Sequence, residues 1–288
     1  MPELPEVEVV KRSLEKNIIN LIIKKVTINT NKLRYNIEKK KFKTIISKKI
    51  LSIKRRSKYL IINLEKNLSI LVHLGMTGKF LIVNKENQIK KTSFYYEINQ
   101  KEKKHNHVVF DLSGNTKLIY NDVRKFGFIK IIPFHNLLDS LHLKLLGPEP
   151  FSKKFNLNYF KKYSIGKKRK IKDVLMDQNF LSGLGNIYVN EILFFSKINP
   201  SRSVNRLSSI EILRVIKFTR KILRNSIRKG GSSISDFNDV LGKKGVFQQE
   251  FKVYSRKGKK CYKKNCLGVI KKFNISNRST FYCKRCQK

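Results

Sequence analysis

The sequence predicts an α+β protein, with a β-sandwich or barrel-like domain at its N-terminal end and helices and a small cysteine-bearing hairpin in its second half. Three observations lead to this prediction. The chain opens with a helical apolar period, continues with closely spaced short strand-like segments, and changes to helical periodicity after about residue 150. At 288 residues it is long enough for two domains that each bury a core.

Apolar residues recur every three or four positions at the start of the chain. They predict an amphipathic helix whose apolar face belongs to the core, formed by Leu4, Val7, Val10, Leu14 and Ile18.

Segments rich in Ile, Val, Phe and Tyr follow, and turn residues such as Gly75 and Gly78 separate them. So many short strands at close spacing favour a β-sandwich or a barrel-like domain. The expected strands are Leu21–Thr30, Ile45–Lys54, Tyr59–Leu64, Ser69–Leu74, Phe80–Val83, Phe94–Ile98, His107–Leu112, Leu118–Asn121 and Phe128–Ile132.

The second half of the chain is predicted to be helical. Short helices are expected at Ile171–Asp177 and Asn186–Phe195, and a longer one at Ser209–Lys229, where Ser208 and Glu211 form a capping box. Gly231–Gly245 is a polar loop long enough to be functional. The expected division is a domain at 1–134, a linker at 135–150, a second domain at 151–246 and a hairpin at 247–288.

Charge points to a polyanionic partner. The 64 Lys and Arg against 20 Asp and Glu give a formal net charge of +44, which favours nucleic acid, although part of the Lys content reflects an overall bias toward Lys, Ile and Asn. The absence of a signal peptide and of any apolar run of 18 residues predicts a cytoplasmic protein without a membrane association.

All four cysteines lie in the last 28 residues, as a C-x4-C pair and a C-x2-C pair: Cys261, Cys266, Cys283 and Cys286. Two close pairs on two turns can bring four thiolates onto one zinc ion, in a closed site that stabilises the fold and takes no part in catalysis. Two disulfides are the alternative, but they fit an intracellular chain poorly.

The first six residues carry a candidate catalytic group. Removal of Met1 would leave Pro2 with a secondary amine, and an α-amino group has a pKa of about 8, so a neutral and nucleophilic fraction exists at pH 7. Glu3 and Glu6 would flank this amine on the first helical turn. A proline at the first helical position with acids behind it is also an ordinary helix start, and these residues alone favour that simpler interpretation.

Five motifs in one order resemble the formamidopyrimidine-DNA glycosylase family over essentially the whole chain. They are MPELPEVE at the start, HLGMTG at 73–78, NDVRKFG at 121–127, GLGNIYVNE at 183–191 and NRSTFYCKRCQK at the end. The resemblance implies a β-sandwich, a helix-two-turn-helix domain and a zinc hairpin. It also implies a monomeric, bacterial, bifunctional enzyme that acts on damaged double-stranded DNA, removes oxidised purines and cleaves the abasic site by β,δ-elimination.

The resemblance also assigns roles to residues. Pro2 would form the Schiff base at C1′, Glu3 would donate a proton and Glu6 would support it. Lys58 would contact a phosphate near the lesion and serve as the proton donor of β-elimination, and Arg278 would have the corresponding role in δ-elimination. Without the motif, Lys58 would be taken for a solvated lysine.

Flipping a nucleotide leaves a gap in the duplex, and the family fills it with an apolar wedge, an aromatic ring and an arginine. By resemblance these are Met76, Phe126 and Arg124, with Arg124 pairing with the orphaned cytosine and Lys125 beside it. In isolation Met76 and Phe126 would be assigned to the core, although the Arg-Lys pair favours a turn.

Further DNA contacts implied by the resemblance are His73, Asn186 and Lys168. His73 by itself would be taken for a structural histidine, whereas Asn186 begins a helix, where backbone amides favour anions. Two departures from the family stand out: the first cysteine pair is separated by four residues where two are usual, and Lys167, Lys168 and Lys170 compete for one family position.

Two other functions compete with this hypothesis. Endonuclease VIII, the sister enzyme for oxidised pyrimidines, shares the amine and the hairpin, but Leu4 and the turn at 124–126 disfavour it. A non-catalytic basic zinc-ribbon protein would explain the charge and the cysteines, but not Pro2, Glu3 and Glu6 together.

Overall fold

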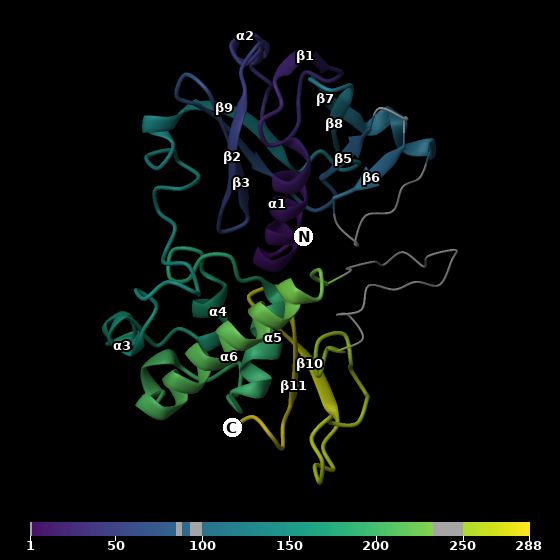
Figure 1. Cartoon of the computed structure of the whole chain (residues 1–288). Helices are drawn as coiled ribbons and strands as arrows, with labels where there is room; N and C mark the ends of the chain where they lie inside the picture. Colours follow the sequence, from purple (N-terminus) through teal and green to yellow (C-terminus); the bar gives the residue numbers. More distant parts are fainter. Residues whose placement is uncertain (1, 85–87, 93–99, 233–249) are drawn as a thin grey trace. The chain divides into compact units, whose positions relative to one another are not determined.

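The structure is a computed structural model that describes residues 2–84, 88–92, 100–232 and 250–288 (Figure 1). The described chain divides into two compact units. One contains the described residues between 2 and 144 together with 230–232, and the other contains 145–229 and 250–288.

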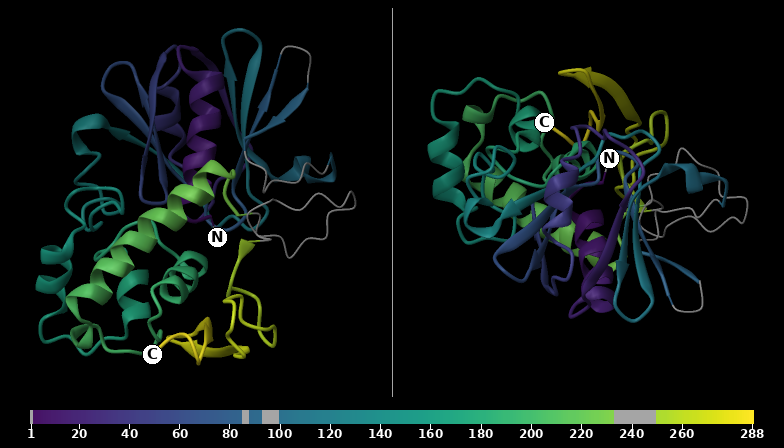
Figure 2. Two further views of the ribbon diagram at one scale, coloured as in Figure 1. Left: turned by 60° about the horizontal axis from the view of Figure 1, so that its bottom comes forward. Right: turned by 90° about the horizontal axis from the view of Figure 1, so that it is seen from above.

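The first unit contains two antiparallel sheets, as predicted (Figures 1 and 2). One sheet has the strand order β1-β7-β8-β5-β6 and the other has the order β2-β3-β4-β9. The strands are β1 (Ile23–Ile28), β2 (Ile50–Arg56), β3 (Tyr59–Leu64), β4 (Leu68–His73), β5 (Lys79–Val83), β6 (Ile89–Lys91), β7 (Asn106–Leu112), β8 (Thr116–Asn121) and β9 (Phe128–Pro133).

Helix α1 (Leu4–Ile18) supplies the core of this unit. Its five predicted apolar residues are all fully buried, and most of them join one buried cluster with side chains from both sheets. Burying a side chain of this size stabilises the fold by about 1.5–3 kcal/mol, so the apolar stripe holds the start of the chain in place.

One strand prediction in this unit was wrong. The segment expected as one strand at 45–54 begins pairing in a strand only at Ile50, after the short helix α2 (Lys39–Lys43) and a turn in which Ser47 has a φ of +63°. Ile45 is buried in the core from this turn, so its apolar character reflects burial outside a strand. The strand expected at 94–98 lies outside the described residues.

Helices form the second unit together with one hairpin. The helices are α3 (Leu157–Ser164), α4 (Ile171–Met176), α5 (Asn186–Phe195) and α6 (Ser209–Arg228), and the hairpin consists of β10 (Ile270–Ile275) and β11 (Arg278–Cys283). Helix α3 was not predicted. Ser208 and Glu211 form the expected capping box of α6.

The hairpin packs against α5 through a small apolar cluster that includes Phe194, Val253 and Phe281. The side chain of Asn190 accepts a hydrogen bond from the Phe281 N–H at 2.7 Å, and the buried Glu191 carboxylate accepts the N–H groups of residues 252–254 at 2.9–3.0 Å. Burial raises the pKa of Glu191. Asn190 therefore holds strand β11, and its neighbour Glu191 holds the segment that precedes the hairpin.

Candidate active site and metal centre

Pro2 lies directly before helix α1, and Glu3 is the N-cap residue of that helix. The interpretation of Pro2 as the first helical residue is therefore wrong, because the helix begins at Leu4 and the proline of its first turn is Pro5. Pro2 and both glutamates are buried. Pro2 therefore lies outside the helix, and the residue that follows it, Glu3, carries a carboxylate.

The Glu6 carboxylate connects two distant parts of the chain. Its Oε2 accepts the backbone N–H of Glu3 at 2.9 Å, while its Oε1 accepts the N–H and the hydroxyl of Ser232 at 2.7 and 2.8 Å. A Cβ atom on Gly231, which has a φ of +83°, would lie 3.2 Å from Oε1. Glu6 thus sets the backbone beside Pro2 and fits closely against the residues that follow α6.

Lys58 and His73 lie at one end of the sheet that contains β3 and β4. Lys58 is buried in the turn between β2 and β3, next to Tyr59, which pairs with His73 across the strands. Burial, together with the positive charges of Lys58 and Arg34, lowers the pKa of His73 to about 4.

His73 is therefore neutral at pH 7. Its Nδ1 atom accepts the Gly75 N–H at 3.1 Å, which places the proton on Nε2, and its ring stacks on Phe128. A neutral N–H donor can bind a phosphate oxygen, but without the attraction of a cation.

Two turns carry the proposed void-filling residues. Met76 lies between β4 and β5 with 45% of its surface exposed, and Phe126 lies between β8 and β9 with 46% exposed. The Arg124 guanidinium lies 4.5 Å from the centroid of the Phe126 ring, and Lys125 has a φ of +56°. The core assignment of Met76 and Phe126 is wrong, and the predicted turn is present.

In the second unit, Asn186 and the tip of the hairpin meet. Asn186 begins α5 and donates through its side-chain amide to the Ser279 carbonyl at 3.0 Å, beside the exposed Arg278. Its amide is thus already engaged by the protein. Lys168 is exposed in the segment before α4.

Lys172 is the residue that sequence reasoning missed. It is fully buried, and its ammonium donates to Thr280 Oγ1 at 2.7 Å, to the Ser279 carbonyl at 3.0 Å and to the Arg278 carbonyl at 3.4 Å. Burial lowers its pKa to about 8. The available signal was a lysine among the apolar residues of a short helix.

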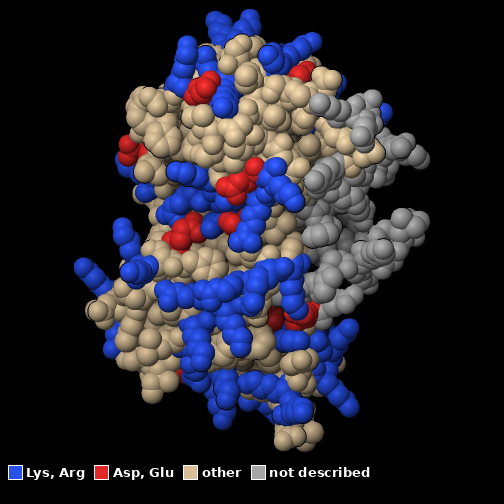
Figure 3. Space-filling view, viewed as in Figure 1, with Lys and Arg blue, Asp and Glu red and all other residues tan. Residues whose placement is uncertain are grey.

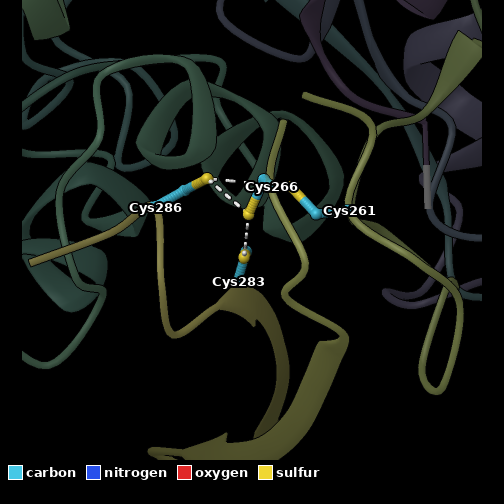
Figure 4. Close-up of side chains that lie close together, drawn as sticks. All are labelled: Cys261, Cys266, Cys283 and Cys286. Atoms are coloured by element: carbon cyan, nitrogen blue, oxygen red, sulfur yellow. Dashed lines mark hydrogen bonds between the residues drawn. The ribbon is translucent and has the colours of Figure 1, made fainter. Parts of the chain in front are cut away.

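The four cysteine sulfurs converge on one point (Figure 4). Three Sγ–Sγ separations are 3.3, 3.7 and 3.8 Å, and all four sulfurs lie within 4.8 Å of one another. These distances exclude disulfides, which need about 2.05 Å. They fit a tetrahedron around zinc, since Zn–S bonds of about 2.3 Å place the sulfurs roughly 3.8 Å apart. A Cβ atom on Gly268 would lie 2.7 Å from Cys283 Sγ, so glycine there leaves space for the cluster.

Basic side chains cover much of the face shown in Figure 3, with few acidic ones among them. Part of this basic surface is the exposed side of α6, which carries Lys217, Lys221, Arg224 and Arg228. Such a surface favours a polyanion. No helix in the described ranges is long and apolar enough to cross a membrane.

Comparison with known proteins gives one consistent result. Residues 1–129 match the formamidopyrimidine-DNA glycosylase N-terminal domain, and residues 146–238 match the H2TH domain of the same enzyme. Formamidopyrimidine-DNA glycosylases of Rickettsia bellii and Rhodopseudomonas palustris are 42% and 35% identical to the chain, each over all of both chains.

Solved structures agree. Lactococcus lactis Fpg in complex with DNA that contains an abasic site is 34% identical, covers 99% of both chains and has a TM-score of 0.84. The complex of the same protein with Fapy-dG DNA is 34% identical, covers 99% of this chain and all of the other, and has a TM-score of 0.83.

Proposed function

This chain belongs to the formamidopyrimidine-DNA glycosylase family, and from that premise we propose how its residues carry out base excision. It is a bifunctional DNA glycosylase and abasic-site lyase of base-excision repair. Its substrate is damaged double-stranded DNA that carries formamidopyrimidines or 8-oxoguanine. The protein acts as a monomer in the bacterial cytoplasm, on the nucleoid.

The observation that carries the catalytic assignment is the placement of Pro2 directly before the buried pair Glu3 and Glu6, in a chain similar over its full length to these enzymes. After removal of Met1, the Pro2 nitrogen attacks C1′ of the damaged nucleotide. The N-glycosidic bond breaks, and its electron pair leaves with the base. Glu3 protonates the deoxyribose ring oxygen, and the opened sugar remains attached to Pro2 as an iminium.

The iminium draws electrons from C2′. Loss of a C2′ proton expels the 3′ phosphate, and a second elimination expels the 5′ phosphate. Lys58, buried at the sheet end, and Arg278, exposed on the hairpin, act as the phosphate-binding proton donors of these two steps. Glu6 holds the Glu3 backbone and thereby keeps the Glu3 carboxylate near the Pro2 amine.

Met76, Arg124 and Phe126 fill the gap left by the flipped nucleotide, and Lys125, His73, Lys168 and Asn186 contact the backbone. The exposure of Met76 and Phe126 favours this role, because an apolar side chain exposed on a short turn is available to insert between bases.

Cys261, Cys266, Cys283 and Cys286 hold one structural zinc ion. The ion stabilises the hairpin and takes no part in the reaction, because four thiolates fill its coordination sphere. Metal analysis of the purified protein should give one zinc per chain.

Borohydride trapping tests the mechanism. Protein with Met1 absent by mass spectrometry should become covalently joined through its N-terminal peptide to a duplex with 8-oxoguanine opposite cytosine. Pro2→Gly should bind this duplex but lose strand cleavage. Pro5→Ala, which changes the other proline near the N-terminus, is the control and should keep strand cleavage. Trapping on dihydrouracil DNA alone would favour an endonuclease VIII activity. Binding without any trapping would show a non-catalytic protein.

A further inference from the structure

The side chains of Met76 and Phe126 are nearly half exposed, so the backbone of their two turns has a large part in determining where they point. The first turn connects β4 to β5 and the second connects β8 to β9. The turns lie against one another, since a Cβ atom on Gly75 would be 2.4 Å from the Gly127 nitrogen.

Asp122 and Thr77 join them. Asp122 is fully buried at the start of the second turn, and its Oδ1 accepts the hydroxyl of Thr77, in the first turn, at 2.5 Å. The Thr77 oxygen in turn accepts the N–H of Arg124 at 3.0 Å. Asp122 Oδ2 accepts the N–H of Gly127 at 2.8 Å.

These hydrogen bonds fix both ends of the segment Arg124–Phe126. One end is held through Thr77, the neighbour of Met76, and the other is held directly by the carboxylate. Asp122 is itself positioned by the Tyr120 hydroxyl at 3.3 Å and through its carbonyl, which lies 2.8 Å from His107 Nε2. A buried carboxylate that accepts several hydrogen bonds makes a stiff connection, because charge-assisted bonds are stronger than neutral ones.

We propose that Thr77 and Asp122 are positioning residues that fix Met76, Arg124 and Phe126 as one unit, and so determine how strictly the enzyme reads the base opposite the lesion. The inference rests on the proposed function, in which Arg124 pairs with the orphaned cytosine. Arg124 can discriminate between bases only if its backbone is held in register with the base left behind. The Thr77 hydroxyl supplies that register, since it accepts the Arg124 N–H.

Thr77→Val tests this directly, because it removes the hydroxyl and keeps the side-chain shape. The measurement is the ratio of single-turnover excision rates for 8-oxoguanine opposite cytosine and opposite adenine. Loss of a hydrogen bond to a charged group corresponds to an effect of about tenfold or more, so this ratio should fall at least about tenfold. Thr77→Ser keeps the hydroxyl and should stay within about twofold of the unmodified protein.

Thr92→Val is the matched control. The Thr92 hydroxyl donates to the Phe80 carbonyl, on strand β5, at 2.7 Å in the same unit, and neither residue belongs to the two turns. This variant should lose thermal stability without changing the cytosine-to-adenine ratio. Asp122→Asn is a second test, since its amide would face at least one of the donors that the carboxylate now accepts, and it should lower the ratio at least as much as Thr77→Val.

The result that overturns the inference is a folded Thr77→Val protein and a folded Asp122→Asn protein that both keep the ratio. Borohydride trapping on a single-stranded abasic site separates this outcome from failure of the proposed function, because that substrate has no opposite base. If the unmodified protein does not trap there or on duplex DNA, the proposed function has failed. If it traps normally and only the ratio is unaffected in the variants, the positioning role alone is wrong.

Discussion

Replacing Lys172 by Met should loosen the cysteine-bearing hairpin. The buried ammonium makes two close hydrogen bonds to the hairpin, to Thr280 Oγ1 and to the Ser279 carbonyl, and a hydrogen bond to a charged group contributes about 1.5–3 kcal/mol. The loss is partly offset. The Ser279 carbonyl still accepts from Asn186, the Arg278 carbonyl still accepts from Thr280, and the desolvation of the ammonium disappears. We therefore expect hairpin opening to become easier by about 2 kcal/mol.

Amide hydrogen exchange of β10 and β11 measures this opening. A change of about 2 kcal/mol corresponds to roughly a 30-fold loss of protection. Strand cleavage should fall as well, because Arg278 lies at the loosened tip. Lys168→Met is the matched control: its exposed side chain should leave protection unchanged, while DNA affinity and its salt dependence fall.

The pH dependence of hairpin opening provides an independent test of the role of Lys172. The pKa of Lys172 is about 8 when buried, against 10.5 in the opened hairpin, so opening takes up a proton between these values. Protection in the unmodified protein should therefore increase with pH in this window, and the deficit of Lys172→Met should widen by at most about 1 kcal/mol between pH 7.5 and 9, after allowance for solvent screening. Equal protection in both proteins, or a deficit that shrinks as pH rises, would refute the reasoning.

Three other results are expected. Removing zinc with a chelator should abolish protection in the hairpin and weaken DNA binding, and restored zinc should recover both; unchanged protection without the metal would contradict a structural ion. His73 has a pKa of about 4 when buried and about 6.5 when unfolded. The free energy of unfolding should therefore fall by up to about 3 kcal/mol as the pH drops from 6.5 to 4, and urea unfolding of His73→Gln should lack this dependence. Glu6→Gln should lower the free energy of unfolding by about 2 kcal/mol, because the new amide group would face either the N–H of Glu3 or the donors of Ser232. A denaturant midpoint equal to that of the unmodified protein would contradict this.

Local patterns were sufficient for much of the fold. The apolar period of α1, the capping box at Ser208 and the alternating strands depend on residues a few positions apart, and the structure has the helix, the capping box and most of the predicted strands. The cysteine spacing likewise predicted the cluster, because the two cysteines of each pair are only a few residues apart in the chain. The failure at 45–54 came because Ile45 is buried from a turn and not from a strand, whereas α3 was missed although Asn156 caps its first turn, which is a local signal.

The contacts that give the site its geometry were decided by tertiary structure. Glu6 meets Ser232 across 226 positions, Lys172 meets Thr280 across 108, and Asp122 meets Thr77 across 45. In sequence, each of these is only a polar residue near an apolar stretch. Whether its polar group meets solvent or a buried hydrogen-bond partner depends on the packing of distant elements, and no local period encodes that packing. The sequence alone therefore determined which chemical groups are present, and the tertiary structure determined which of them hold the others in place.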